Sequence, residues 1–169
     1  MSIQLRPFGE RDLEFLDRLV TDPTCSEPFQ WFGFGSPQTL RRRWEEDGFL
    51  GKDPHHLAIV QSDTVIGWVM WRKGSRATHG VLEIGAVLAP EHRGEGSGTA
   101  AQQQLVDYLL ATTTVHRIWA GTEADNVAEQ RALEKCGFQR EGRLRSQVFR
   151  GGEWRDSIIY GLLRTDSRS

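Results

Sequence analysis

Cysteine is scarce in this chain, with only two among 169 residues. Two thiols are too few for a disulfide scaffold, and Cys25 and Cys136 lack the spacing of paired metal ligands. Histidine is also sparse, and its five copies form neither an H-x-x-x-H motif nor a Cys/His cluster. They stand at His55, His56, His79, His92 and His116. The sequence therefore predicts no metal site.

Long hydrophobic runs and strong charge are missing as well. No apolar stretch approaches the roughly eighteen residues of a membrane span, and the first residues lack the profile of a signal peptide. The net charge of −2 provides no polybasic surface for nucleic acid or membrane. We therefore expect a cytoplasmic protein without a nucleic-acid or membrane partner, and its mild acidity is compatible with a cationic acceptor such as an amine.

The length suits one domain, which we place at residues 1–164, followed by a polar tail at 165–169. Hydrophobic periodicity and turn residues predict the order β-α-α-β-β-β-α-β-α-β-β. The strands are expected at 4–7, 57–61, 65–72, 81–88, 117–122, 138–149 and 154–163, and the helices at 10–20, 37–47, 97–111 and 127–136. This order predicts an α/β fold of the α+β sandwich type with a mixed sheet, not a doubly wound fold.

The helix expected at 97–111 has an amphipathic pattern. Its apolar side is expected to pack on the sheet and its amides and acid to face solvent. The predicted buried residues are Ala101, Leu105, Tyr108 and Leu109, and the predicted outward residues are Gln102, Gln103 and Asp107.

A glycine-rich loop joins the strand at 81–88 to this helix, with the sequence Arg93-Gly94-Glu95-Gly96-Ser97-Gly98. Glycines let the backbone approach a ligand, and the first helical turn adds unpaired N–H groups, so the loop predicts an anion site. It is not a Walker loop, because no Gly-Lys-Ser/Thr follows Gly94. It is not a Rossmann fingerprint, because the glycines form G-x-G-x-G and residues 108–122 hold no acid. A glycine-rich solvent-exposed turn remains the alternative.

The run Arg93 to Gly98 resembles the R/Q-x-x-G-x-G/A signature of the GNAT superfamily of N-acetyltransferases. A second run, from Asn126 to Glu134-Lys135-Cys136-Gly137-Phe138, is similar to the superfamily's N-x-x-(A/S) motif ending in E-K-x-G-F. Glu129 replaces the small residue of that motif.

The C-terminal part extends the resemblance. Residues 140–145 and 151–160 look like the tail of the RimJ/RimL branch, whose members acetylate protein N-terminal amines and whose relatives act on polyamines and antibiotics. The similarity covers most of the chain from about Leu57 onward. It implies a GNAT fold, in which a mixed, mostly antiparallel sheet of six to seven strands is flanked by about four helices.

The resemblance also implies the reaction and the binding residues. It implies transfer of an acetyl group from acetyl-CoA, without a metal, to a primary amine of a small molecule or a protein N-terminus, by direct attack in a ternary complex. The implied acetyl-CoA residues are Ala86, Val87, Leu88, Arg93, Gly94, Glu95, Gly96, Ser97, Gly98, Thr99, Asn126 and Arg131. The first three would bind pantetheine through their backbone, and the loop amides would bind the pyrophosphate. The splayed sheet of such domains also allows a homodimer.

Several of these residues have a second interpretation. Arg93 either adds positive charge or forms an ion pair with Glu91 or Glu95. Asn126 contacts the pantetheine or caps a helix, and both are compatible. Arg131 or Lys135 approaches the adenosine 3′-phosphate, or stays solvated on an exposed helix.

Acyl transfer needs a base for the amine, stabilisation of the developing oxyanion and a proton for the departing thiolate. A backbone N–H near Val87 or Leu88 would polarise the carbonyl. Glu83 is the first candidate for the base, because it shares a strand face with Gly85 and Val87. Alternatively, Glu83 orients the amine or pairs with an arginine. Glu123 is the second candidate.

The proton donor departs from the superfamily pattern. Leu133 stands where many members have tyrosine, and Glu129 where the RimL type often has serine. The alternative proton donors are Tyr160, Ser97, Glu129 and a water. A further alternative is that the thiolate leaves without a proton donor. These departures keep two further functions open, a catalytically weak CoA-binding module and a transferase that uses aminoacyl-tRNA, although the acidic charge argues against the latter.

An aromatic, glycine-punctuated segment spans residues 28–35. Trp31, Phe32 and Phe34 are predicted to form a wall of the acceptor pocket, because small-ligand sites are mostly apolar and aromatic. The alternative is a hydrophobic lid that closes the core.

Overall fold

The fold is taken from a computed structural model that describes residues 2–74 and 80–166. His79 and the last three residues of the expected C-terminal tail lie outside the described residues. The strands are β1 (Ile3–Arg6), β2 (His55–Gln61), β3 (Thr64–Lys73), β4 (Val81–Leu88), β5 (Arg117–Glu123), β6 (Gln139–Arg150) and β7 (Glu153–Leu163). The helices are α1 (Leu13–Thr21), α2 (Pro37–Asp47), α3 (Ser97–Thr112) and α4 (Val127–Lys135), with short 3-10 turns η1 (Glu10–Asp12), η2 (Pro23–Cys25) and η3 (Pro90–His92). The predicted order of strands and helices is confirmed.

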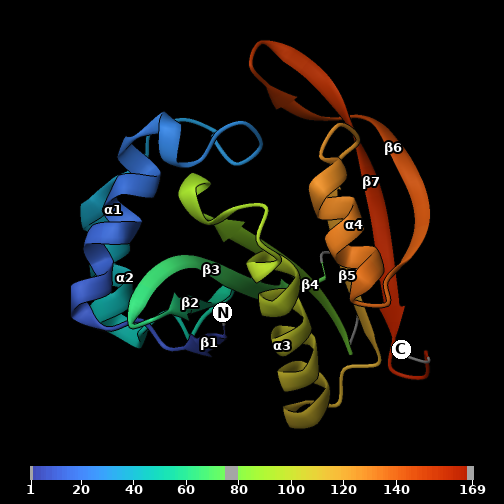
Figure 1. Cartoon of the computed structure of the whole chain (residues 1–169), viewed down its shortest axis with the longest axis horizontal. Helices are drawn as coiled ribbons and strands as arrows, with labels where there is room; N and C mark the ends of the chain where they lie inside the picture. Colours follow the sequence, from blue (N-terminus) through green and yellow to red (C-terminus); the bar gives the residue numbers. More distant parts are fainter. Residues whose placement is uncertain (1, 75–79, 167–169) are drawn as a thin grey trace.

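The strands form one sheet in the order β1-β2-β3-β4-β5-β7-β6 (Figure 1). Neighbouring strands are antiparallel except β4 and β5, which are parallel. The mixed, mostly antiparallel sheet is therefore confirmed. The long β6–β7 hairpin turns at Gly151 and Gly152, whose φ angles of 62° and 82° suit the turn that matches strand twist.

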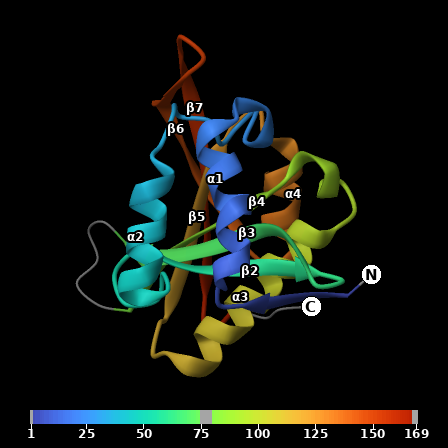
Figure 2. The same ribbon diagram turned by 90° about the vertical axis from the view of Figure 1, so that its left-hand side faces the viewer.

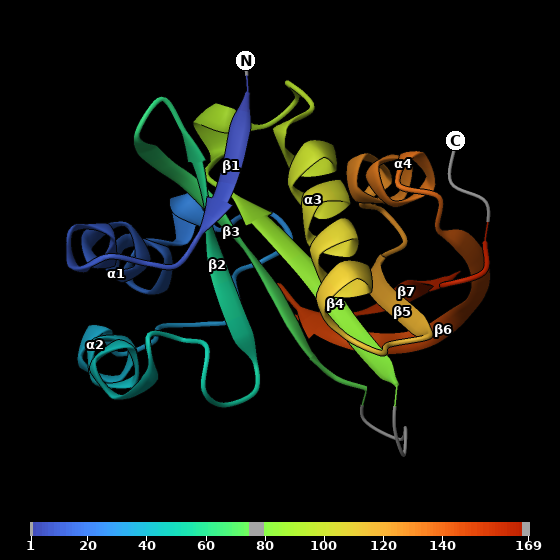
Figure 3. The same ribbon diagram turned by 90° about the horizontal axis from the view of Figure 1, so that it is seen from below.

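The helices cover both faces of the sheet. Helices α1 and α2 lie in front of the strands in Figure 2, and α3 and α4 lie on the other face in Figure 3. One buried cluster joins α3 and α4 to the sheet through side chains such as Leu105, Leu133 and Ile158. A second cluster, which includes Leu16 and Phe49, joins α1 and the segment after α2 to β2. Each helix layer thus has its own apolar core. Among the described helices, none is long and apolar enough to cross a membrane.

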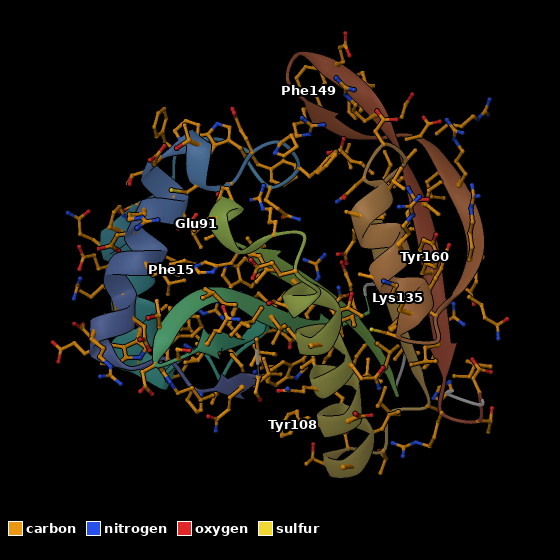
Figure 4. All side chains as sticks on the ribbon, viewed as in Figure 1. Phe15, Glu91, Tyr108, Lys135, Phe149 and Tyr160 are labelled. Carbon is orange, nitrogen blue, oxygen red and sulfur yellow. The ribbon has the colours of Figure 1, made fainter. Side chains whose placement is uncertain are left out.

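Helix α3 corrects the predicted assignment of its faces. Gln102 is only 1% exposed, whereas Tyr108 is 45% exposed near the end of α3 that lies far from the glycine loop (Figure 4). The physical reason is that α4 packs against α3, and the Gln102 amide donates a hydrogen bond to Glu129 of α4 at 3.3 Å. A pattern that assumes one buried face cannot separate the sheet-facing side of α3 from the side that faces α4.

Strands β4 and β5 separate soon after they start. Their pairing covers only Val81–Glu83 of β4 and Arg117–Trp119 of β5. Strand β5 continues along β7 as far as Glu123, and β4 continues along β3 as far as Leu88. In Figure 1 the end of β4 lies near the centre of the molecule while β5 runs beneath α4. We call the space between the unpaired halves of β4 and β5 the wedge.

Candidate active site

The glycine loop leaves the end of β4 and opens helix α3. Gly94 and Gly96 have φ angles of 83° and 85°, a left-handed conformation that glycine adopts at little cost. The first helical hydrogen bond runs from the Ala100 N–H to the Gly96 carbonyl at 3.0 Å. The N–H groups of Ser97 to Thr99 therefore precede the helical hydrogen-bond pattern and are available to a ligand.

The space next to this loop is open. A Cβ placed on Gly94 or Gly96 would meet no described atom within 4 Å. At Gly98 the added atom would lie 3.3 Å from the Leu88 side chain, so the helix start packs on the end of β4. Free amides, a helix N-terminus and open space are features that favour an anion, and the predicted pyrophosphate contacts of this loop stay a prediction.

The wedge leads directly to this loop. Ala86, Val87 and Leu88 lie on β4 beyond its last pair with β5, so the strand edge that faces the wedge has no partner strand in the described pairing. An edge of this kind offers N–H and C=O groups to an extended ligand. The predicted pantetheine strand thus ends close to the start of the predicted pyrophosphate loop in the chain.

Arg93 makes two backbone contacts that the sequence did not predict, and its proposed charge for the ligand stays a prediction. Its Nε donates to the Leu88 carbonyl at 2.9 Å and its Nη1 to the Glu27 carbonyl at 2.5 Å. The ion pair considered with Glu91 is absent from the described ion pairs, because Glu91 lies 3.6 Å from Arg18 instead. Burial lowers the pKa of the Arg93 guanidinium. Arg93 therefore joins the loop to the segment before the aromatic residues, and it occupies the Leu88 carbonyl.

Asn126, Arg131 and Lys135 lie on or just before α4. Asn126 caps this helix, because its side-chain oxygen accepts from the Glu129 N–H at 3.3 Å. Arg131 and Lys135 are exposed. The end of α4 is tied to the start of α3 by the Cys136 thiol, which donates to the Thr99 carbonyl at 3.4 Å. The helix-cap interpretation of Asn126 is confirmed, and the ligand contacts of these residues stay predictions.

Glu83 lies on β4 directly opposite Arg72 of β3. Its two carboxylate oxygens accept from Arg72 Nε and Nη2 at 2.7 and 2.8 Å, and its side chain is 13% exposed. Glu83 shares a strand face with Val87, about 13 Å further along the strand at roughly 3.3 Å per residue. The arginine pair that was the alternative to a base therefore forms, and the acid lies on the same side of the sheet as Val87.

Glu123, the second predicted base, ends strand β5. Its buried carboxylate accepts from Arg150 Nε and Nη2 at 2.6 and 2.7 Å. The Arg150 guanidinium also lies over the Phe29 ring at 5.3 Å. Glu123 thus takes part in a tether between β5, β6 and the N-terminal segment.

The three side chains considered as proton donors have different surroundings. Tyr160 is fully buried on β7 beneath α4, and its hydroxyl donates to Glu134 at 2.9 Å (Figure 4). Ser97 is buried at the first position of α3. Glu129 is half-buried in the first turn of α4, and burial raises the pKa of its carboxyl to about 7. A carboxyl with this pKa carries a proton in a large fraction of molecules at neutral pH.

The environment of Glu129 predicts a pH-dependent cost to stability. Its pKa is raised in the folded chain, so the folded state binds more protons than the unfolded state between its ordinary pKa and about 7. The free energy of unfolding should therefore fall as the pH rises through this window. Glu129→Gln removes the ionisation, and we expect it to be more stable than the unchanged chain by about 1–3 kcal/mol at pH 8 but not at pH 4. Urea unfolding at both pH values measures this difference.

The control for this prediction is Glu14→Gln, which changes an exposed glutamate of α1. In Glu14→Gln, the free energy of unfolding should change between pH 4 and pH 8 by the same amount as in the unchanged chain. An equal response of both variants would show that burial of Glu129 has no effect on stability.

A cavity of about 270 Å³ lies between α1, α2 and the sheet. Its wall is mostly apolar, and its sheet side is formed by His56 of β2, Trp68 of β3 and Val87 of β4. Trp31, Phe32 and Phe34 are not among the described residues that line it, although the preceding residue Gln30 is. Phe32 and Phe34 are 67% and 80% exposed, so they do not close the core.

No signal in the sequence predicts this cavity. Its lining residues come from separate helices, strands and loops, and the apolar residues among them have the sequence pattern of an ordinary core. The Trp31 and Phe34 rings contact each other edge to face, with 5.1 Å between their centroids. The acceptor wall that is expected from Trp31, Phe32 and Phe34 stays a prediction.

Residues 2–139 match the family described as Acetyltransferase (GNAT) domain. A probable N-acetyltransferase of Bacillus subtilis (strain 168), YjcK, is 35% identical over 120 residues, which are 69% of this chain and 66% of the relative. Spermidine N(1)-acetyltransferase of Escherichia coli (strain K12) is 22% identical over 157 residues, 93% of this chain and 83% of the relative. The match to YjcK thus spans slightly less than two thirds of that relative's length.

Solved structures show the same fold. An acetyltransferase (GNAT family) from Bacillus anthracis has a TM-score of 0.81 at 22% identity, covering 98% of this chain and 97% of that one. Spermidine N-acetyltransferase from Vibrio cholerae in complex with CoA and spermine has a TM-score of 0.81 at 21% identity. The match covers 97% of this chain and 96% of that one.

Proposed function

The chain belongs to the GNAT family of acetyltransferase domains, and on this premise we propose that it transfers an acetyl group from acetyl-CoA to a primary amine. The observation that carries the proposal is the wedge, which ends at a glycine loop with free helix amides. The tail resemblance supports a place in the RimJ/RimL-like branch. A cytoplasmic location and a homodimer stay predictions.

The described residues fit the chemistry of coenzyme A. Its pyrophosphate is an anion, and the loop from Gly94 to Thr99 offers backbone N–H groups and open space for it. A hydrogen bond to a charged group contributes about 1.5–3 kcal/mol, and a helix N-terminus adds roughly 0.3–2. Several such bonds would favour CoA binding without a lysine. The unpaired edge of Ala86 to Leu88 suits the amide groups of the pantetheine arm.

In the proposed reaction the neutral amine attacks the thioester carbonyl. A C–N bond forms, the C–S bond breaks, the amine loses a proton and the thiolate gains one. We assign the polarisation of the carbonyl to a backbone N–H near Val87 or Leu88. The Leu88 carbonyl already accepts from Arg93 Nε, so only the N–H of this residue is proposed for that role.

Glu83 is proposed as the base that takes the amine proton, through water. Its support is geometric, since it lies on the same strand face as Val87, and Arg72 holds its carboxylate in a fixed orientation. The distance of about 13 Å along the strand requires intervening water.

Glu129 is proposed as the proton donor to the thiolate. It stands where the RimL type often has serine, beside the start of α3, and its raised pKa keeps a proton available near neutral pH. Tyr160 has less support, because its hydroxyl already donates to Glu134 beneath α4.

The test of the proposed function is thiol release from acetyl-CoA by the purified chain with a panel of primary amines. We expect release that depends on the amine, with the acetylated amine identified by mass spectrometry. Binding of CoA without thiol release with any amine would instead support the CoA-binding module. Leu133, which stands where many members of the superfamily have tyrosine, is compatible with that alternative.

A further inference from the structure

The cavity beside β4 lies next to the proposed reacting groups. The Val87 side chain forms part of its wall, and Val87 lies on β4 beyond the last pair of this strand with β5. Gln30 is exposed and also lines the cavity, so this residue marks the side that reaches the surface. An acceptor that enters past Gln30 with its amine directed toward Val87 would reach the strand proposed to hold the acetyl group.

The volume of this cavity suits one ring. An apolar cavity of about 150 Å³ is large enough to bind benzene, so 270 Å³ accommodates an aromatic ring with a short side chain. The apolar surface that such a group would contact comes from four side chains, those of Leu16, Leu19, Leu40 and Phe49.

The charges around the cavity are unfavourable for a polyamine. No aspartate or glutamate is found among the described residues that line it, and Arg43 is the cation there. Arg43 donates to the carbonyls of Pro54 and Lys52 and lies 5.4 Å from the Phe49 ring centroid. Asp47, an acid near this region, accepts from the backbone N–H groups of Phe49 and Lys52 at 2.8 and 3.0 Å.

The histidine in the wall provides no negative charge to an ammonium group. His56 lies between Phe49 and Trp68, at ring-centroid distances of 5.7 and 5.0 Å. Burial lowers its pKa to about 4, so the imidazole is neutral at physiological pH. Its Nδ1 has no hydrogen-bond partner among the described residues. The wall therefore offers a neutral polar atom and aromatic edges, but no negative charge.

We infer that this cavity is the acceptor pocket and that it takes an uncharged apolar group, such as the ring of an arylalkyl monoamine, in preference to a polyamine. The inference rests on the proposed function. A second ammonium group inside the cavity would lose its hydration without a carboxylate to replace it, beside a cationic Arg43. Burial of an aromatic ring in the same cavity is favourable, because it removes apolar surface from water. Some relatives are named for spermidine, but this pocket prefers an arylalkyl monoamine to that polyamine.

The first test compares kcat/KM for 2-phenylethylamine and spermidine in the thiol-release assay, at one pH and with saturating acetyl-CoA. We expect at least a tenfold higher value for 2-phenylethylamine. A higher value for spermidine would overturn the inference while leaving the proposed function in place.

The second test fills the cavity with Leu40→Trp. Leu40 is a partly buried residue of α2 that lines the cavity, and the neighbouring Thr39 is exposed, so Thr39→Trp is the matched control. Leu40→Trp should lower kcat/KM for 2-phenylethylamine at least tenfold, with unchanged CoA affinity and a melting temperature close to that of Thr39→Trp. Equal kinetics for both variants would overturn the inference.

Calorimetric titration of the protein–CoA complex with 2-phenylethylamine tests the pocket independently of turnover. Binding that Leu40→Trp abolishes and Thr39→Trp preserves supports the pocket, even if spermidine and 2-phenylethylamine both fail to release thiol. Failure of every amine in the thiol-release assay would overturn the proposed function alone. Absence of binding to the CoA complex would overturn the inference.

Discussion

Replacing Gly96 with valine is expected to weaken the binding of coenzyme A at least about 100-fold. A Cβ at this position would project into the open space beside the loop amides, where the pyrophosphate is proposed to bind. The φ angle of 85° also disfavours a branched residue, so the loop would shift. Loss of two hydrogen bonds of about 1.5–3 kcal/mol each is sufficient for this effect. Calorimetric titration with CoA measures it.

Gly152→Val is the matched control for this substitution. Gly152 has a φ angle of 82°, and a Cβ there would also meet no described atom within 4 Å. It lies in the β6–β7 turn rather than in the loop, so the backbone strain is similar but CoA affinity should not change. Unchanged CoA affinity in Gly96→Val would show that the glycine loop does not bind the pyrophosphate.

Replacing Glu83 with glutamine is expected to lower kcat about 100-fold, with the largest loss at low pH. Glutamine keeps the size of the side chain but cannot accept the proton that the amine must lose. At low pH more of the amine is protonated, so proton removal limits turnover more strongly. The pH dependence of kcat between about pH 6 and 9 measures this effect. A purely structural role of the Arg72 pair would lower the melting temperature without changing the shape of this profile.

Glu123→Gln is the comparison that separates the two candidate bases. Glu123 is buried against Arg150, and loss of its charge leaves that arginine without its partner. We therefore expect a lower melting temperature but an unchanged shape of the pH–rate profile. If instead Glu123→Gln changes the profile and Glu83→Gln does not, Glu123 is the base.

Local signals in the sequence were sufficient for much of the fold. The predicted limits of α2 are correct at both ends, because a proline begins the helix and Gly48, in a left-handed conformation, ends it. The sequence predicts a glycine-rich turn between a strand and a helix, and the structure places Gly94 and Gly96 of this turn in the left-handed conformation that glycine adopts at little cost. Turns, caps and loops of this kind depend on residues that are close in the sequence.

Contacts between distant residues could not be predicted in the same way. Glu83 and Arg72 meet because β3 and β4 pair in one particular register. Arg93 bonds to Glu27, which lies 66 residues away in the chain. The burial of Gln102 depends on how α4 packs against α3. None of these arrangements leaves a periodic signal in a single sequence.

The most direct measurement of the central claim is a calorimetric titration of the unchanged chain with coenzyme A, repeated in the presence of inorganic pyrophosphate. We expect one CoA to bind per chain, pyrophosphate to compete with it, and a hundredfold excess over Kd to raise the melting temperature by roughly 5–10 °C. No heat of binding together with an unchanged melting temperature would contradict the claim that the amides at the start of α3 bind the pyrophosphate of acetyl-CoA.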